Sequence, residues 1–155
     1  MTRNNYILLA AGGSLGLVLL ALGFQHIGGV EPCKMCYWQR YPHYAAVVIG
    51  LLALLLGGRL WIALGALAAA TTMGLGAFHT GVERKWWEGP QSCTGDGGLS
   101  TMTGSDLLDF ENTPLPVMCD DIAWDTWGLG ITMANWNVVI SLLFVLLWLR
   151  ALRKV

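Results

Sequence analysis

The chain has 155 residues, of which 55% are hydrophobic and only 12% are charged, and its formal net charge is −1. This length is enough for one compact domain, while the charged fraction is about half of the roughly 25% that is usual in soluble domains. The composition argues against an ordinary soluble domain, and we expect no nucleic-acid partner.

Four apolar runs follow one another along the chain, at 6–25, 37–57, 60–82 and 129–149. The first has no charged residue and is about as long as a helix that crosses a hydrocarbon core, although a cleaved signal peptide is an alternative for it. The second begins among aromatic residues, which favour the membrane interface, and contains Pro42. Together the runs predict an all-α fold, a four-helix transmembrane bundle that forms a single membrane domain over residues 1–155.

The connections between these runs differ greatly in length. Only residues 57–59 separate the second run from the third, which predicts an antiparallel hairpin. The segment 83–128 between the third and fourth runs is long and polar. Loops of this length in small proteins are usually functional or disordered.

The charges are distributed unequally between the two sides of the predicted membrane. The side with both termini carries only basic residues, namely Arg3, Arg59, Arg150, Arg153 and Lys154, and all ten acidic residues fall on the other side. Because basic loops stay in the cytoplasm, we expect both termini there and the segments 26–36 and 83–128 outside. All four cysteines then lie where disulfides can persist.

Cys33 and Cys36 form a C-x-x-C motif, which can close a reactive disulfide and often lowers a thiol pKa. Tyr37 excludes a haem attachment motif, which needs His at that position. Arg40 follows Cys36 by four residues and shares its face of a helix, so it can stabilise a thiolate or hold an oxygen of a cofactor. The alternative is that Arg40 anchors a helix end at the lipid headgroups.

Cys93 and Cys119 both lie in the long outer segment. They form either a structural disulfide or a second redox pair exposed to a soluble protein. The nearby glycines favour the redox pair, because they are expected to keep the region mobile: Gly95, Gly97, Gly98 and Gly104. A zinc site built from all four cysteines is a further alternative, but the wide spacing of these two argues against it, and no metal is expected.

Several residues inside the apolar runs have two interpretations. An ionisable residue in a membrane helix, such as His79, is a candidate functional residue, and Glu83 four residues later can orient it. The alternative is an interfacial histidine bonded to a backbone carbonyl. Asn135 and Asn137 can bond between helices, and the glycines at 12 and 16 are typical of close helix packing.

Three stretches resemble one known family, DsbB, the disulfide bond formation protein B family of bacterial inner membranes. They are EPCKMCYWQR at 31–40, FHTGVERKWWEGPQSC at 78–93 and PLPVMCDDIAWDTWGLGITMANWN at 114–137. The resemblance implies a thiol:quinone oxidoreductase of the inner membrane. Such a protein reoxidises DsbA, a soluble periplasmic thiol oxidase, and reduces ubiquinone or menaquinone.

The resemblance also implies a role for each site residue. Cys93 would form the mixed disulfide with the partner, Cys119 would exchange with Cys33, and Cys36 would face the quinone as a thiolate. Arg40 and His79 would lie near the quinone ring.

Two other functions compete with this interpretation. A vitamin K epoxide reductase homologue also combines helices, a C-x-x-C and a quinone, but its C-x-x-C follows the loop cysteines, whereas here it precedes them. A non-enzymatic membrane protein would use its disulfides only as braces. A quinone is favoured because oxidising DsbA, at about −120 mV, with an ordinary disulfide below about −300 mV would run uphill, and the sequence has no nucleotide-binding glycine motif.

Overall fold

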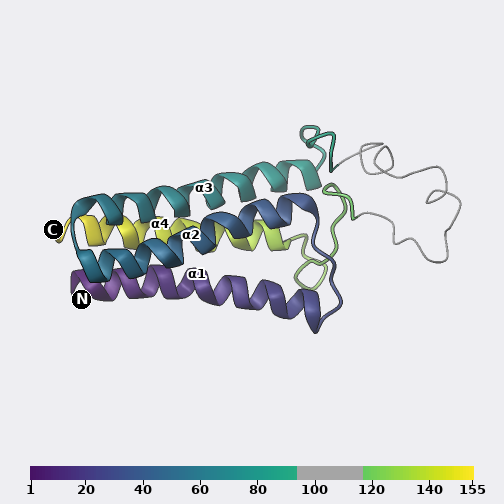
Figure 1. The fold of residues 1–155 in the computed structure, drawn as a ribbon. Helices are drawn as coiled ribbons and strands as arrows, with labels where there is room; N and C mark the ends of the chain where they lie inside the picture. The colour runs from purple at the N-terminus through teal and green to yellow at the C-terminus, as the bar shows by residue number, and fades with distance from the viewer. Residues whose placement is uncertain (94–116) are drawn as a thin grey trace, which may run out of the picture.

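The computed structural model describes residues 1–93 and 117–155. Over these two ranges the chain forms four helices and no extended strand: α1 (Arg3–His26), α2 (Lys34–Leu56), α3 (Arg59–Glu83) and α4 (Met133–Leu152) (Figure 1). The predicted all-α, four-helix bundle is confirmed. The glycines from which mobility was predicted, Gly95, Gly97, Gly98 and Gly104, lie outside the described residues.

Local sequence explains where the helices begin and end. Thr2 caps α1 by accepting a hydrogen bond from the backbone N–H of Asn5 at 3.3 Å, and Thr132 forms a capping box with Asn135 at the start of α4. The turn between α2 and α3 needs residues with positive φ, and the two glycines at 57 and 58 supply φ values of 69° and 86°. Helices α2 and α3 pack together, as their short connection predicted.

Helix α4 begins at Met133, four residues after the start of the fourth apolar run. The chain before it is held in a tight turn by the carboxylate of Asp125, which accepts hydrogen bonds from the backbone N–H groups of Gly128 (3.3 Å) and Gly130 (3.1 Å). Both glycines have positive φ, which is not a helical conformation. The residues from 129 to 132 therefore form a turn instead of the first turn of α4.

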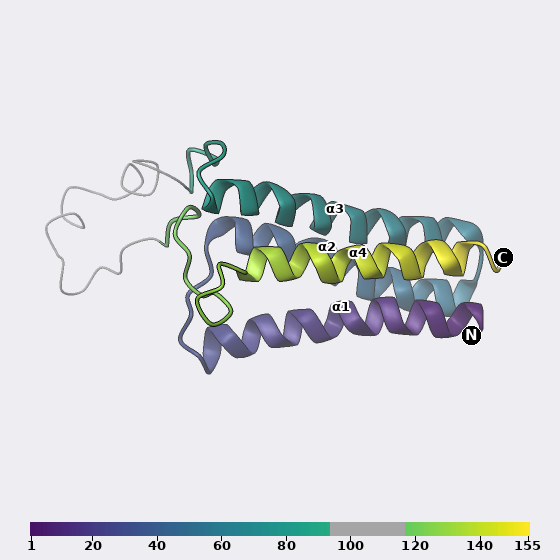
Figure 2. The same ribbon diagram turned by 180° about the vertical axis from the view of Figure 1, so that it is seen from behind.

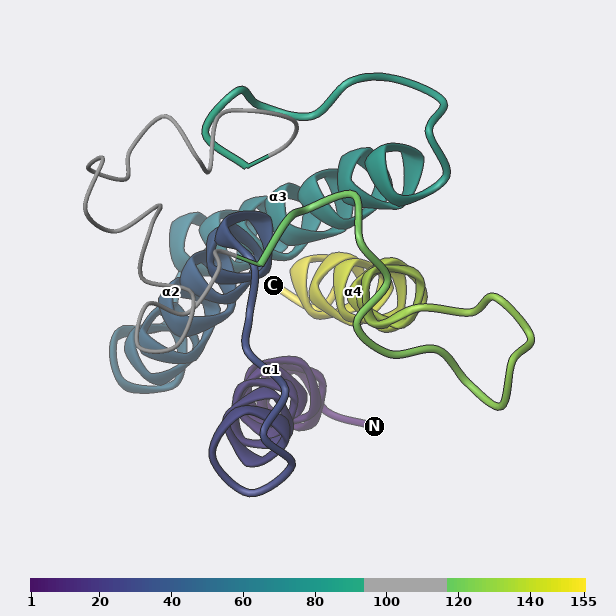
Figure 3. The ribbon, with the colours of Figure 1, turned by 90° about the vertical axis from the view of Figure 1, so that its right-hand side faces the viewer.

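The four helices form a closed ring in which α1 contacts α2 and α4, and α3 contacts the same two neighbours. Figures 1 and 2 show the bundle from opposite sides, with both termini at one end and the start of α2 at the other. Figure 3 shows the ring along its axis. The bundle therefore has a terminal end and an opposite end, and all four cysteines lie at the opposite end.

The terminal end is a tightly packed apolar core. Trp148 of α4 is completely buried there, against small residues of the other helices. A Cβ added at Gly65 would lie 2.6 Å from the Trp148 ring, so only glycine lets α3 approach α4 this closely.

The outer surface of the bundle is apolar, with large side chains such as Leu19, Leu55 and Leu67 more than half exposed. Three of the four helices found in the described residues, α1, α3 and α4, are long and apolar enough to cross a membrane. Helix α2 carries Lys34 and Arg40 in its first part and is not among the three. Exposed apolar residues on helices of this length identify a membrane protein.

Candidate redox site

Cys33 and Cys36 sit at the N-terminus of α2. Cys33 is the N-cap residue, and its sulfur accepts a hydrogen bond from the backbone N–H of Cys36 at 3.2 Å, in place of the usual oxygen. The two sulfur atoms are 2.7 Å apart, and both thiols are free. The unpaired N–H groups and the dipole of a helix N-terminus favour negative charge on a thiol placed there.

The two thiols of this pair differ in acidity. Hydrogen bonding from the Cys33 thiol is the largest cause that lowers the pKa of Cys36, with a smaller contribution from the charge of Arg40, while burial acts in the opposite direction. The hydrogen bond to Cys36, followed by burial, raises the pKa of Cys33. The shared proton therefore stays on Cys33, and the negative charge forms on Cys36.

Cys93 and Cys119 form a disulfide next to this pair. The backbone N–H of Cys119 donates to the carbonyl of Cys93 at 2.7 Å, and both residues are buried in one apolar cluster with Cys33, Met35 and Val82. Their burial, 3% and 0% exposed, differs from the exposed pair expected from the sequence. Cys93 is therefore covered by apolar neighbours in this structure.

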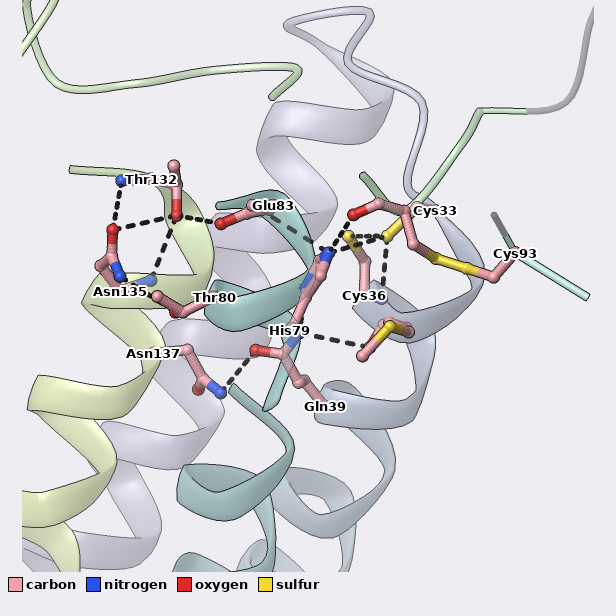
Figure 4. A network of polar contacts seen from close by, with 12 residues as sticks. Cys33, Cys36, Gln39, His79, Thr80, Glu83, Cys93, Thr132, Asn135 and Asn137 are labelled. Carbon is pink, nitrogen blue, oxygen red and sulfur yellow. Dashed lines mark hydrogen bonds and ion pairs between the residues drawn. A yellow bond between two sulfur atoms is a disulfide. The ribbon is translucent and has the colours of Figure 1, made fainter. Parts of the chain in front are cut away.

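His79 of α3 lies beside the cysteines and contacts a member of each pair (Figure 4). Its Nε2 is 3.6 Å from the Cys33 sulfur and 3.1 Å from the carbonyl oxygen of Cys119. One ring nitrogen and the sulfurs of Cys33 and Cys119 all lie within 4.8 Å of one another. These are ligand types of a zinc site, but the Cys119 sulfur is bonded to Cys93, so in this state it is not a free thiolate ligand, and the free thiol of Cys33 lies close to the disulfide.

Glu83, which the sequence predicted to orient His79, approaches it from the next turn of α3. Its Oε1 is 3.9 Å from Nε2 of His79, and its Oε2 accepts a 2.6 Å hydrogen bond from the Thr132 hydroxyl. The second contact ties the end of α3 to the start of α4, so Glu83 both faces His79 and holds two helices together.

Arg40 connects α2 to the end of α1 rather than contacting the thiols directly. Its guanidinium donates to the side-chain oxygen of Gln25 at 2.6 Å and to the carbonyl of Ala21 at 3.4 Å, and it lies 5.2 Å from the centre of the Tyr37 ring. A guanidinium has five N–H donors, so these contacts leave others for a ligand.

A cavity of about 310 Å³ opens beside Cys36, between α1, α2 and α4, and His79 and Glu83 of α3 also border it. Its walls are mainly apolar, and the polar groups on it include Cys36, Arg40, His43 and His79. Cys36, Arg40 and His43 are spaced by four and three residues along α2, so they line one face of that helix. This lining suits a mainly apolar molecule with a few polar atoms.

The structure also contains a buried polar network, of which sequence reasoning predicted the interhelical bonding of Asn137 but not the part played by Gln39 and His43. Gln39 joins His79 at 2.8 Å to Asn137 at 2.8 Å, and Asn137 in turn contacts Nε2 of His43 at 2.9 Å. The predicted interhelical bond of Asn135 is also present, to the hydroxyl of Thr80 at 2.9 Å. The available signal for Gln39 and His43 was their spacing of three and seven residues from Cys36, on the cysteine-bearing face of α2.

A membrane bundle that holds a dithiol against a disulfide defines a thiol–disulfide oxidoreductase of membranes. The family model described as "Disulfide bond formation protein DsbB" matches residues 3–151 of the chain. The chain belongs to the DsbB family, and the resemblance seen in the sequence is confirmed.

Three curated relatives illustrate the match, and each carries the name "Disulfide bond formation protein B". The protein of Paracidovorax citrulli is 31% identical, over 94% of this chain and 86% of its own length. That of an Acidovorax species is 32% identical, over 92% and 84%. That of Verminephrobacter eiseniae is 31% identical, over 99% and 88%. No solved structure gives a significant match.

Proposed function

We propose that this chain reoxidises a periplasmic DsbA-like dithiol oxidase and passes the electrons through its two cysteine pairs to a membrane quinone. The observation that carries the proposal is the meeting of the pairs, in which the sulfurs of Cys33 and Cys119 lie within 4.8 Å of each other. Cys36, the second member of the inner pair, borders the cavity. The site thus offers a continuous path from an outer disulfide to a membrane pocket.

The topology that we propose follows from the charges. Both termini lie in the cytoplasm, the protein resides in the bacterial inner membrane, and the spans are 6–25, 37–57, 60–82 and 129–149. The periplasmic segments are 26–36 and 83–128, which contain every cysteine and every acidic residue. The common location of the termini at the end away from the cysteines supports this arrangement (Figure 1).

The first step of the relay takes place at the outer disulfide. A thiolate of the reduced partner attacks Cys93, a mixed disulfide forms, and Cys119 leaves as a thiolate. Because Cys93 is 3% exposed, the partner has to displace part of the apolar cluster around it. The Cys119 sulfur lies within 4.8 Å of the Cys33 sulfur, which supports assigning the exchange with the inner pair to Cys119 and the attack by the partner to Cys93.

The second step joins the pairs. With the inner pair oxidised, the Cys119 thiolate attacks Cys33, a Cys33–Cys119 disulfide forms, and Cys36 leaves as a thiolate. Its lowered pKa makes Cys36 the better leaving group. The second thiolate of the partner then releases Cys93, which attacks Cys119 and sets Cys33 free. In sum, the partner loses two electrons and two protons, and the inner pair holds them as a dithiol.

The cavity fits the remaining acceptor. Apolar walls from α1 and α4 and the polar groups of Cys36 and Arg40 suit a quinone head group. Arg40 would hold a ring oxygen through its remaining N–H donors, and His79 would contribute from the same wall. A bound ubiquinone or menaquinone would supply an acceptor of two electrons and two protons. Cys33 and Cys36 then return to the disulfide.

The test is a coupled assay with purified protein, a reduced DsbA-like partner and a soluble quinone analogue. We expect stoichiometric loss of quinone absorbance and of partner thiols, and we expect Cys36→Ser to abolish both. Ser141→Ala is the matched control, since this buried hydroxyl lies on α4 and donates to Asn137 at 3.2 Å. Quinone reduction that persists in Cys36→Ser would disprove the relay.

A further inference from the structure

Gln39 of α2 is buried between His79 and Asn137 (Figure 4), and its hydrogen bonds fix which end of its amide faces each of them. Nε2 of Gln39 lies 3.2 Å from the backbone carbonyl of Met35. A carbonyl oxygen can only accept, so this atom is the nitrogen and donates.

A second backbone carbonyl gives the same orientation independently. Nδ2 of Asn137 lies 3.1 Å from the carbonyl oxygen of Thr72 and therefore donates. The same NH₂ group lies 2.8 Å from the other end of the Gln39 amide, which must then be the accepting oxygen. The backbone carbonyls of Met35 on α2 and Thr72 on α3 thus give the same orientation of the Gln39 amide.

This orientation determines where the proton of His79 resides. The Gln39 Nε2 that donates to Met35 also faces Nδ1 of His79 at 2.8 Å, so Nδ1 accepts and carries no proton. The neutral ring then has its proton on Nε2. That N–H faces the carbonyl of Cys119 at 3.1 Å and the sulfur of Cys33 at 3.6 Å, and both are acceptors.

We propose that Gln39 is a positioning residue for disulfide exchange, which acts by keeping the His79 proton on Nε2, directed at the sulfur of Cys33. The inference rests on the proposed exchange between Cys33 and Cys119. When Cys93 attacks Cys119 in the last step of the proposed relay, the Cys33 sulfur leaves as an anion, and in the reverse of that step Cys33 attacks Cys119 as an anion. An N–H donor stabilises that anion in both directions. The other tautomer would place a lone pair against the Cys119 carbonyl.

The tautomer can be measured without any assay of activity. Nitrogen-15 NMR separates protonated from unprotonated imidazole nitrogens, and the chain has only three histidines. The signals missing from His79→Gln identify His79. We expect wild-type His79 to carry its proton on Nε2, and Gln39→Glu to move a proton onto Nδ1, because a carboxylate only accepts. A wild-type proton on Nδ1 would overturn the proposal.

The exchange step can be isolated in a Cys36→Ser background, without partner or quinone. There the Cys33 thiolate attacks Cys119, the Cys33–Cys119 bond forms, the Cys93–Cys119 bond breaks, and Cys93 leaves as a thiolate. Trapping with an alkylating reagent and peptide mass spectrometry follow the rate. A hydrogen bond to the anion raises the thiolate population about tenfold, and the accompanying loss of nucleophilicity removes about threefold.

We therefore expect Gln39→Leu to slow the trapping of Cys93 about threefold and to lose the single His79 tautomer. Ser141→Ala is the control, because it touches the far side of Asn137 and leaves Gln39 unchanged. Equal rates in Cys36→Ser with and without Gln39→Leu, or an unaltered His79 tautomer in Gln39→Leu, would overturn the proposal. The outcome is separate from the proposed function, which fails only if the wild-type protein does not pass partner electrons to quinone.

Discussion

Cys33 and Cys36 belong to a helix, whereas Cys93 and Cys119 belong to the connection between α3 and α4. The first pair is fixed by the backbone of α2, and its sulfurs are polarised by the helix terminus and by each other. The second pair is held by its own disulfide, by one backbone hydrogen bond and by apolar packing. A helix end suits a thiolate with a set pKa, and a loop suits a disulfide that has to be uncovered and exchanged.

The strongest test of this difference is to remove the cysteine of the outer pair that faces the inner one. In Cys119→Ala, a partner that has formed a mixed disulfide with Cys93 cannot be displaced by Cys119. When a partner variant without its resolving thiol is used and Cys93 is preloaded with a small leaving thiol, we expect nearly complete trapping on Cys93 in non-reducing gels. Trapping on Cys33 instead would reverse the roles of the two pairs.

The two thiols of the inner pair should differ in their pH dependence. The pKa of Cys36 is lowered and that of Cys33 is raised. We therefore expect iodoacetamide to modify Cys36 first, with a midpoint below the ordinary value of 9.0. Since the thiolate is the reactive form, the reactivity is present above the lowered pKa and is lost as the pH falls through it. Preferential modification of Cys33, quantified by peptide mass spectrometry, would contradict the assignment.

Arg40 tests whether the cavity beside the inner pair is a quinone site. Arg40→Ala removes N–H donors from the cavity wall, and a charged hydrogen bond of about 1.5 kcal/mol corresponds to about a tenfold increase in KM for quinone. Arg84→Ala is the matched control, because Arg84 donates to the carbonyl of Gly130 instead and does not line the cavity. Equal KM values for the two variants would make Arg40 an anchor of α1 rather than a ligand.

Hydropathy alone was sufficient to predict the helices and the hairpin of α2 and α3. Charge counts were sufficient to predict that the four cysteines lie on the same side. Both properties can be read from short stretches of the sequence. Side-chain contacts between helices were harder to predict. The glycines at 12 and 16 matched a packing motif, yet nothing among the described residues lies within 4 Å of the Cβ either would carry, whereas a Cβ at Gly13 would lie 2.5 Å from the ring of Phe144. Helix rotation decides which glycine meets a neighbour, and rotation depends on partners far away in the sequence.

The same reason explains what was missed at the site. Gln39 and Asn137 are 98 residues apart and meet through their side chains only after α2 and α4 pack. His79 could be selected as an ionisable residue in an apolar helix, but its contact with Cys33 depends on the angle between α2 and α3. Its predicted place beside a quinone remains a prediction, and its position on the cavity wall is compatible with both roles.

The smallest expected effect concerns the ion pair of Lys85 and Asp120, which links the end of α3 to the outer cysteine segment. The Lys85 side chain is 65% exposed, so we expect Lys85→Met to change the free energy of unfolding in detergent by less than about 1 kcal/mol. The hydrogen bond from Lys85 lowers the pKa of Asp120, so the pair stabilises the fold above the ordinary pKa of 3.8 and loses this effect as the pH falls through the lowered value. A larger loss would show that this ion pair, rather than the disulfide and its apolar cluster, holds Cys119 against Cys33.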